Sequence, residues 1–583
     1  MAQRAPGSGS GRRGRSGRIG TATLVAVAVA IAAVCMIALT TKAVLGRASC
    51  TNTPVVANVV ASDDIAPAVQ VVANTFNNQN VTVGGRCVQV QVDEADSATE
   101  AAQIDGQAAR QGAAVDAWIP DSSLWVDVAR TYPVGAQVVQ PTGKSVALSP
   151  LMLVTTRAVA SETGVFIAPP SWSLLLPSAY GGPPASEGVT VDLPDPTTSA
   201  AGLASLIQVS RQLGTGPAAR TAVTDFALGV QSTENFDSPT ALAQFVATTQ
   251  PPFDRKAITV ATEQAVLAYD KTTPSTPLDA VYATGADQAL GTPELDYPYV
   301  LTATQAAPLQ GAAKFGNYLQ TAYAQSVLRG YGFRSANGQA DVMPRTAGLS
   351  GQPLQLASAA SPTEAAANLQ VWQRLGLGFR DLVLTDVSPA MNQPSGLGTL
   401  TLEQLLAQTA SKGLGLFPDS TEMGVWDIGE SASATQPYTQ VVPIGPLSAT
   451  VGVLTRRAQI EQIDATATTS ADGALALNNA ILAAYQKMTE GYAPQYVNAV
   501  IVLTAGVDTA PGDISTSSLL AQLQKLYNPS RKVEVIVLMF GSQGNFAALQ
   551  QVAAATGGAA FQVTNPSEIG QVFVEAVAQR VAP

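Results

Sequence analysis

The chain has 583 residues, of which 46 % are hydrophobic, so it is long enough for more than one domain with its own core. It contains no histidine, which excludes Ser-His-Asp and Cys-His catalytic units and any metal site that uses imidazole. Residues 1–18 hold five of the 31 basic residues and no acid, and the remaining chain carries 26 basic against 42 acidic residues. Such an acidic body argues against nucleic-acid binding.

The N-terminal region predicts a membrane anchor. Residues 1–18 are basic and rich in Gly and Ser, so they should form a disordered cytoplasmic tail. The 23 residues at 19–41 carry no charge, and as a helix they would span about 34 Å, enough to cross a bilayer. Because the arginines precede this segment, we expect a single-pass helix in the cell membrane, with the C-terminal part extracellular. A cleaved signal peptide is the alternative, although 19–41 is longer than its usual apolar core.

The three cysteines divide between the anchor and the exported part. Cys35 lies inside the apolar segment, whereas Cys50 and Cys87 follow it. Outside the cell a Cys50–Cys87 disulfide is the natural interpretation. Two free buried thiols are the alternative.

The first exported domain should cover residues 50–335. Strand patterns at 55–60, 88–92 and 151–155 alternate with helical patterns at 65–77 and 98–110. Strands that alternate with helices predict an α/β layered domain.

Several blocks in this domain resemble, in the expected order, the extracellular solute-binding proteins of the type II periplasmic-binding fold. The blocks are Ala61-Ser62-Asp63-Asp64-Ile65-Ala66-Pro67, Asp116-Ala117-Trp118-Ile119-Pro120-Asp121-Ser122-Ser123, Leu148-Ser149-Pro150, Leu193-Pro194-Asp195-Pro196-Thr197-Thr198-Ser199, Ala261-Thr262-Glu263-Gln264 and Leu295-Asp296-Tyr297-Pro298-Tyr299. A late helix predicted over 312–330 then leads into Gly330-Tyr331-Gly332-Phe333. The resemblance covers about 280 residues and implies two lobes with a ligand cleft between them. It also implies that the chain crosses to the second lobe near Ser149-Pro150 and returns near 259–264.

Polar residues at strand-to-helix transitions are the candidate ligands of a small polar solute. Hydroxyl groups and free N–H groups at helix starts can hold a polar or anionic ligand, and a carboxylate could meet a cationic group. The alternative is that these residues only cap helices and turns. The candidates are Ser62, Ser122, Ser123, Ser149, Thr197 and Asp296.

A second exported domain should follow a linker. Residues 336–370 are rich in Gly, Ala, Ser and Pro, which is typical of a domain boundary. From 371 to 583 strands and helices alternate, so we expect an open, doubly wound α/β sheet. The predicted strands are 381–385, 422–428, 440–444, 499–504, 533–540 and 560–563, and the predicted helices are 402–412, 472–488, 517–526, 546–556 and 566–579.

The motifs of this second domain resemble the von Willebrand factor A family. Asp386-Val387-Ser388 follows an apolar strand, Val500-Ile501-Val502-Leu503-Thr504 resembles the family's fourth strand, and residues 541–558 end in Thr556-Gly557-Gly558 like its last helix. The resemblance covers about 200 residues and implies the same doubly wound fold. The family binds a metal ion with Asp-x-Ser-x-Ser, a threonine and an aspartate.

The metal-ion-dependent adhesion site that this resemblance implies is degenerate. Ala390 replaces the second serine, Ala505 replaces the aspartate, and no hydroxyl lies at the expected threonine position near Ala474-Leu475. Asp386 and Ser388 are the two ligands left, so we expect the site to be empty or to bind Mg²⁺ weakly at most. Asp508 and Asp472 are possible substitutes. We predict no other cofactor.

The sequence therefore predicts a membrane-anchored, extracellular and non-catalytic binding protein. The domain pairing is similar to fusions of substrate-binding and von Willebrand A domains in actinobacteria. An extracellular protein partner of the second domain and a small polar solute of the first domain are both expected. A solute receptor for an ABC-type transporter is the alternative function.

Overall fold

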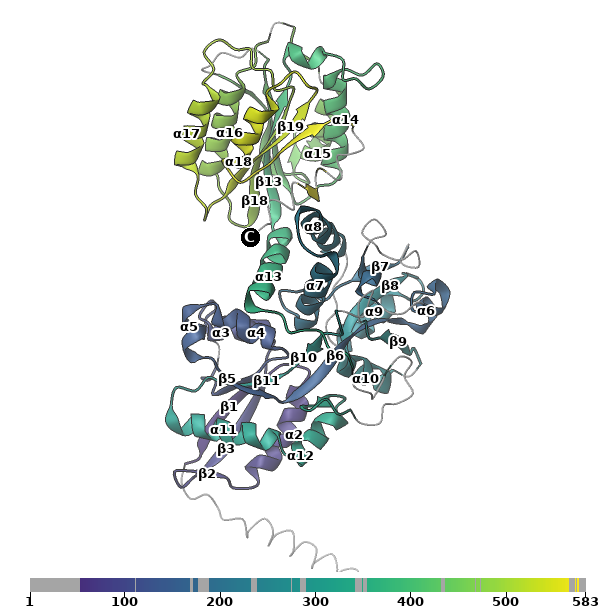
Figure 1. Cartoon of the computed structure of the whole chain (residues 1–583), viewed down its shortest axis with the longest axis vertical. Helices are drawn as coiled ribbons and strands as arrows, with labels where there is room; N and C mark the ends of the chain where they lie inside the picture. Colours follow the sequence, from purple (N-terminus) through teal and green to yellow (C-terminus); the bar gives the residue numbers. More distant parts are fainter. Residues whose placement is uncertain are drawn as a thin grey trace, which may run out of the picture.

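The computed structural model describes residues 53–565, 572, 574 and 575, apart from 111, 168–170, 177–187, 232–238, 274, 284–289, 341–348, 350–353, 431–435, 467 and 472. Within these ranges the chain forms a two-lobed first module and a second module, joined by one helix (Figure 1). The predicted anchor at 19–41, the tail before it and Cys50 lie outside the described residues. None of the helices in the described ranges is long and apolar enough to cross a membrane.

The first lobe is built on a six-stranded sheet with the order β2-β3-β1-β4-β11-β5. Strand β1 pairs in parallel with β3 and β4, and β11 lies antiparallel between β4 and the edge strand β5. The strands predicted at 55–60 and 88–92 are confirmed as β1 and β3. The strands are β1 Val55–Ala61, β2 Thr82–Val83, β3 Arg86–Glu94, β4 Ala117–Ile119, β5 Gln140–Ser145 and β11 Pro298–Leu301, and the helices are α2 Ala66–Asn77, α3 Ser97–Ile104, α4 Ser123–Arg130, α5 Pro133–Val138, α11 Ala306–Leu319 and α12 Ala322–Gly330.

The second lobe is organised around the long strand β6, which pairs with β8, β9, β10 and β12. This strand confirms the prediction at 151–155. The strands are β6 Ala147–Thr156, β7 Thr190–Asp192, β8 Ala257–Thr262, β9 Leu278–Val281, β10 Glu294–Leu295 and β12 Arg334–Ser335, and the helices are α6 Arg157–Thr163, the 3₁₀ helix η1 Trp172–Leu175, α7 Ala200–Leu213, α8 Pro217–Gln231, α9 Pro239–Thr248 and α10 Glu263–Thr272.

The chain enters the second lobe at the expected place but leaves it later than predicted. Strand β6 begins directly after β5, which puts Ser149-Pro150 at the crossing. The predicted return near 259–264 is wrong, because β8 is buried along its whole length between β6 and β7. The return runs instead from β10, which pairs with β6, into β11, which pairs with β4 of the first lobe.

Two helices predicted in the first module have different bounds. The helix predicted over 98–110 ends at Ile104, because Gly106 takes a positive φ of 84° and turns the chain away. The helix predicted over 312–330 is two helices, α11 and α12. Thr321 separates them, since its hydroxyl accepts a hydrogen bond from the N–H of Ala324 and starts the second helix.

The predicted linker contains a helix, α13, over Pro362–Gly376. Ser361 and Glu364 form a capping box at its start and Pro362 occupies the first turn, which are strong helix-start signals. A buried stripe of Ala365, Leu369, Trp372 and Leu375 stabilises α13 by packing. Helix α13 therefore begins inside the predicted linker and ends beyond residue 370.

The second module is the predicted doubly wound sheet, with the order β15-β14-β13-β18-β19-β20. All neighbours are parallel except β15, which is an antiparallel edge strand. The strands are β13 Gly378–Asp386, β14 Glu422–Ile428, β15 Thr439–Pro446, β18 Tyr496–Thr504, β19 Val533–Phe540 and β20 Ala560–Val563, with a separate hairpin of β16 Thr450–Val451 and β17 Leu454–Thr455. The helices are the 3₁₀ helix η4 Pro389–Asn392, α14 Leu402–Leu414, α15 Arg456–Thr466, α16 Leu477–Glu490, α17 Thr516–Leu526 and α18 Phe546–Ala554.

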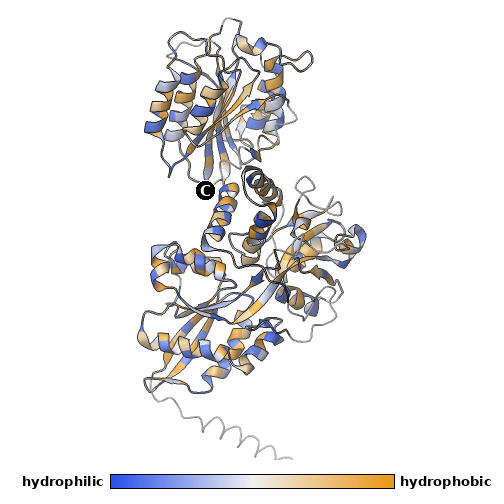
Figure 2. Cartoon of the chain, in the orientation of Figure 1, coloured by the Kyte–Doolittle hydropathy of each residue, from blue (hydrophilic) through white to orange (hydrophobic). Residues whose placement is uncertain are grey.

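Both faces of this second sheet are covered. Helices α16, α17 and α18 bury one face, and α14 and α15 bury the other. Hydrophobic residues accordingly run along its central strands (Figure 2). The helix predicted from 472 begins only at Leu477, where the carboxylate of Asp513 accepts hydrogen bonds from the N–H groups of Asn478 and Asn479. Most of the helix predicted at 566–579 lies outside the described residues.

Candidate functional site

The hinge of the first module is fastened at Ser149. This serine is fully buried, and its hydroxyl oxygen accepts a hydrogen bond of 3.1 Å from the N–H of Gln264 at the start of α10. Strand β10 pairs antiparallel with β6 at the same point, with Leu295 opposite Ser149. Ser149 therefore joins segments of the second lobe next to the crossing. Its burial leaves no free hydroxyl for a solute in this conformation.

Three predicted ligands gather at the start of α4. The Ser122 hydroxyl caps this helix by accepting from the N–H of Leu124 at 3.2 Å. The N–H of Ser123 donates to Oδ1 of Asp296 at 2.7 Å. Asp296 thus places a carboxylate at the helix N-terminus, where an anionic ligand would otherwise be stabilised.

Ser62 contacts Asp64, a residue that the sequence interpretation did not name as a candidate ligand. Its hydroxyl donates to Oδ1 of Asp64 at 2.7 Å, and the hydroxyl of Tyr297 donates to the other oxygen of Asp64. Tyr297 follows Asp296 directly in the chain. The two recognised blocks Ala61–Pro67 and Leu295–Tyr299 therefore meet through Asp64 and Tyr297. The only sequence signal for this contact was that each residue lies within one of the two blocks.

Thr197 lies in the loop before α7. Its hydroxyl and its N–H both donate to Oδ1 of Asp195, each at 2.9 Å. The indole N–H of Trp372, from helix α13, donates to the same oxygen at 2.9 Å. The hydrogen bonds of Thr197 therefore stabilise the loop in this conformation, and the Asp195 carboxylate accepts all three of these bonds.

The acidic groups around the hinge have raised pKa values. Burial raises the pKa of Asp121 to about 8, and the charge of Asp64 adds to the effect. Burial likewise raises the pKa of Asp64 and of Asp296, and it raises the pKa of Glu294 to about 7. Burial is the largest cause of each shift, and neighbouring acids add to it at Asp121 and Glu294.

In the second module, the two residues left from the metal motif lie together at the carboxyl edge of the sheet. Asp386 is 1 % exposed at the end of β13. Its Oδ1 accepts from the N–H of Ser388 at 2.9 Å, and its Oδ2 accepts from the Thr504 hydroxyl at 2.7 Å and from the N–H of Ala505 at 3.1 Å. Protein donors therefore bind both oxygens of the carboxylate.

Two described groups in the neighbouring loops, the Ser470 hydroxyl and Asp508, have other partners. The N–H of Ser470 donates to the carbonyl of Val387 at 2.8 Å, but its hydroxyl donates to the carbonyl of Glu430 at 2.9 Å. Asp508, a suggested substitute, interacts with Asp513, while Asp472 lies outside the described residues. In the described ranges no three or more His, Cys, Asp or Glu residues are grouped so that they could hold a metal ion. The residues around Asp386 therefore do not fit Mg²⁺, which requires a near-complete oxygen shell.

The loop before α16 lies unusually close to this edge. Gly429 follows β14 with a φ of +86°, and a Cβ atom at this position would lie 2.8 Å from the Cβ of Ser388. A Cβ on Gly473 would lie 1.9 Å from the carbonyl oxygen of Gly429. Both contacts require glycine. Glycine at positions 429 and 473 therefore allows the loop before α16 to pack closely against the carboxyl edge of the sheet.

A cavity of about 340 Å³ opens beside the degenerate site. Its walls include the carboxyl groups of Asp427, Glu430 and Asp464 and the hydroxyl-bearing residues Thr385 and Ser470. Burial raises the pKa of Asp427 to about 6 and that of Asp464 to about 7, and in each case a neighbouring acid adds to the shift. The cavity can accept a cationic or hydroxylated group. The sequence interpretation missed it because β14, the loop after β14 and α15 supply its acids separately.

Comparison with known proteins matches each module to a family. Residues 57–334 match the family model of the bacterial extracellular solute-binding proteins, and residues 397–575 match that of the von Willebrand factor type A domain. Two uncharacterized proteins of Mycobacterium tuberculosis, from strains H37Rv and CDC 1551, are each 26 % identical to this chain over 588 residues. Each match covers 94 % of this chain and 81 % of the relative.

Several solved structures match part of the chain at low sequence identity. The sulfate-binding protein SubI of Mycobacterium tuberculosis H37Rv is 19 % identical, with a TM-score of 0.34, and the match covers 48 % of this chain and 87 % of that protein. Iron-bound HitA of Pseudomonas aeruginosa is 14 % identical, with a TM-score of 0.40, over 56 % of this chain and all of HitA. A von Willebrand factor type A protein of Catenulispora acidiphila is 15 % identical, with a TM-score of 0.27, over 35 % of this chain and 43 % of its own.

Proposed function

Since this chain joins an extracellular solute-binding domain to a von Willebrand factor A domain, we propose that it is a non-catalytic binding protein at the outer face of the cell membrane. In this proposal residues 19–41 anchor it and the von Willebrand A domain binds a protein partner without a metal ion. The observation that carries the proposal is that three protein donors bind the two oxygens of the Asp386 carboxylate. A metal-dependent domain would need this carboxylate free to face the ion.

The partner would be held by the carboxyl edge of the second sheet. The cavity lined by Asp427, Glu430 and Asp464 supports a partner that inserts a lysine or arginine side chain. Such a side chain would favour ionisation of acids whose pKa values burial has raised. Binding should therefore weaken at high ionic strength but should not respond to a chelator.

Calorimetric titration of the full chain in detergent with Mg²⁺, Mn²⁺ and Ca²⁺ tests the absence of metal dependence. We expect no saturable heat from any of the three ions. Asp386→Ala is the matched variant, and circular dichroism establishes that it is folded. Micromolar binding in the parent that disappears in Asp386→Ala would overturn the metal-free mechanism.

Membrane anchoring is tested by extraction at alkaline pH. The full chain should remain with the membrane pellet, whereas a variant that lacks residues 1–42 should be soluble. Recovery in the supernatant of a product that lacks the N-terminal segment by mass would instead favour cleavage.

The second candidate function is a solute receptor for a transporter, and the two-lobed hinge favours it. The carboxylates of Asp296 and Asp195 occupy the start of α4 and the loop before α7, so we propose a neutral or cationic solute rather than an anion. Thermal denaturation with spermidine, glucose and sulfate tests this, because a ligand of the folded state raises Tm by mass action. A rise with sulfate alone would contradict the proposed solute class.

A further inference from the structure

Helix α13 lies where the two lobes and the second module meet. It packs against α7 and α8 of the second lobe and against α4 of the first lobe. It stands between these helices, below the second module (Figure 1). Only Leu377 separates its last residue, Gly376, from Gly378, the first residue of β13 in the second sheet. One helix therefore touches both lobes and continues directly into the second module.

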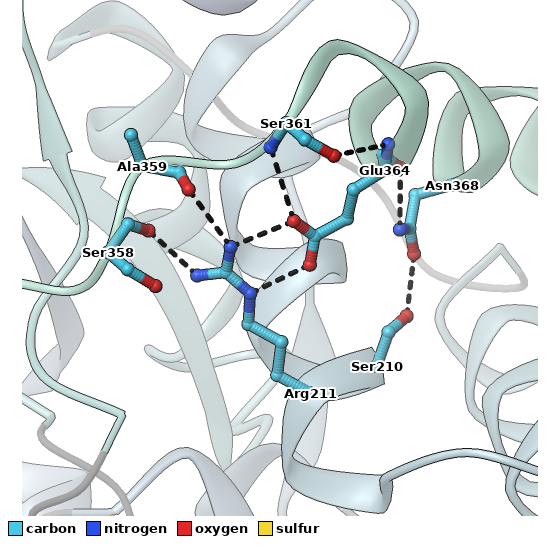
Figure 3. A network of polar contacts seen from close by, with 7 residues as sticks. All are labelled: Ser210, Arg211, Ser358, Ala359, Ser361, Glu364 and Asn368. Atoms are coloured by element: carbon cyan, nitrogen blue, oxygen red, sulfur yellow. Dashed lines mark hydrogen bonds and ion pairs between the residues drawn. The ribbon is translucent and has the colours of Figure 1, made fainter.

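The N-terminal half of α13 is held to the second lobe by polar contacts. Arg211 at the end of α7 forms a bidentate ion pair with Glu364, with N–O distances of 2.7 and 2.8 Å (Figure 3). The same guanidinium donates to the carbonyls of Ser358 and Ala359, at 2.8 and 3.3 Å. Ser210 adds a hydrogen bond of 2.6 Å to Asn368. Bidentate, charge-assisted bonds of this kind fix geometry as well as adding stability.

The C-terminal half of α13 is held by burial. Trp372 is 3 % exposed, and its indole N–H binds Asp195 in the loop before α7. Ala365, Leu369 and Leu375 are buried with it in one continuous core that includes Trp125 of α4 and Leu203 of α7. Removal of these apolar side chains from water stabilises the packing of α13. The same stripe therefore contributes to the core of both lobes.

We propose that α13 is an intramolecular strap, which holds the two lobes together without a solute. Opening of the lobes would separate α4 from α7, so α13 must leave at least one of them. Because a single residue joins α13 to β13, the second module must move with the helix. Solute binding in the first module and the position of the second module are then coupled, and the coupling acts in both directions.

Distances between spin labels in the full chain test the strap. We choose genetically encoded labels, which leave the native cysteines unchanged, at the exposed positions Ala109 in the first lobe and Lys271 in the second. The test variant combines Trp372→Phe and Glu364→Gln, which removes the indole donor and the ion pair but keeps an aromatic ring at 372 and a side chain of equal length at 364. Gln373→Ala, on the exposed face of α13, is the control.

The parent and the control should give one narrow interlobe distance. The double variant should give a broader distribution whose mean is longer by more than about 2 Å, the scale of a lobe rearrangement. A third label at Gln524 in the second module should change its distance to Lys271 in the same sample. An unchanged interlobe distance in the folded double variant would overturn the proposal. If the double variant does not fold, Glu364→Gln alone, which keeps Trp372 in place, must broaden the distribution for the proposal to stand.

Discussion

The Thr504 hydroxyl donates a hydrogen bond of 2.7 Å to Asp386, across two neighbouring parallel strands of the second sheet. Asp386 is buried, so loss of a donor leaves its carboxylate less compensated. We predict that Thr504→Val lowers the free energy of unfolding of the second module by about 1–3 kcal/mol. Chemical denaturation measures this loss. Thr439→Val, at an exposed position of β15, should stay within about 0.5 kcal/mol of the parent.

The hinge region contains a buried ion pair between Arg334 and Glu263, with side chains 3 % and 1 % exposed and a distance of 2.7 Å. Arg334→Met should cost about 3–5 kcal/mol of stability, because it leaves a buried charge without its partner. Combining it with Glu263→Gln should recover part of the loss. The exposed pair of Arg157 and Asp279 is the control, and Arg157→Met should cost at most about 1 kcal/mol. Equal losses at both pairs would contradict this prediction.

Asp121 should make the first module less stable as the pH rises. Burial raises its pKa from 3.8 to about 8, so between these values the folded state holds a proton that the unfolded state has lost. Stability therefore falls with rising pH in this window. Asp121→Asn removes the titration, and its Tm relative to the parent should increase from pH 5 to pH 8.5. Asp93→Asn, at an exposed position of β3, controls for the loss of one negative charge.

The contacts between α13 and the second lobe should weaken in acid but should not change near neutral pH. The hydrogen bonds from Arg211 hold the pKa of Glu364 below its usual value of 4.5. The contribution of the ion pair is therefore complete above pH 4.5 and is lost as the pH falls through the lower folded-state pKa. The distribution of interlobe distances should stay constant from pH 5 to pH 8 and should broaden only at lower pH. In Glu364→Gln this acid response should be absent.

Cys50 and Cys87 remain a predicted disulfide. Mass spectrometry of the purified chain after alkylation without reduction should find neither thiol modified. Cys87→Ser should lower stability by about 3–4 kcal/mol, according to the entropy of a loop of this length. Alkylation of both residues in the folded, unreduced chain would show that they are free thiols.

Short-range patterns predicted most of the second sheet. Its strands at 422–428, 533–540 and 560–563 have the expected bounds, because an apolar run flanked by turn residues determines a buried strand locally. The start of helix α16 did not follow from local patterns. Helix α16 begins at Leu477 because Asp513, far along the chain, caps it, and no local signal reports that contact. The place where the chain returns to the first lobe was predicted wrongly because it depends on which strands pair, and β10 pairs with β6 whereas β11 pairs with β4.

The sequence by itself determined the types of the modules, the missing ligands at Ala390 and Ala505, and the carboxylate and hydroxyl at the end of β13. Residue identity and local periodicity are sufficient for those conclusions. Only the tertiary structure decided what these groups contact: Thr504 and Ala505 bind Asp386, Asp64 joins Ser62 to Tyr297, and Trp372 binds Asp195. Apart from the local bond between Ser62 and Asp64, each of these contacts joins residues more than 100 positions apart. Their pairing depends on how complete helices and strands pack, which no local pattern specifies.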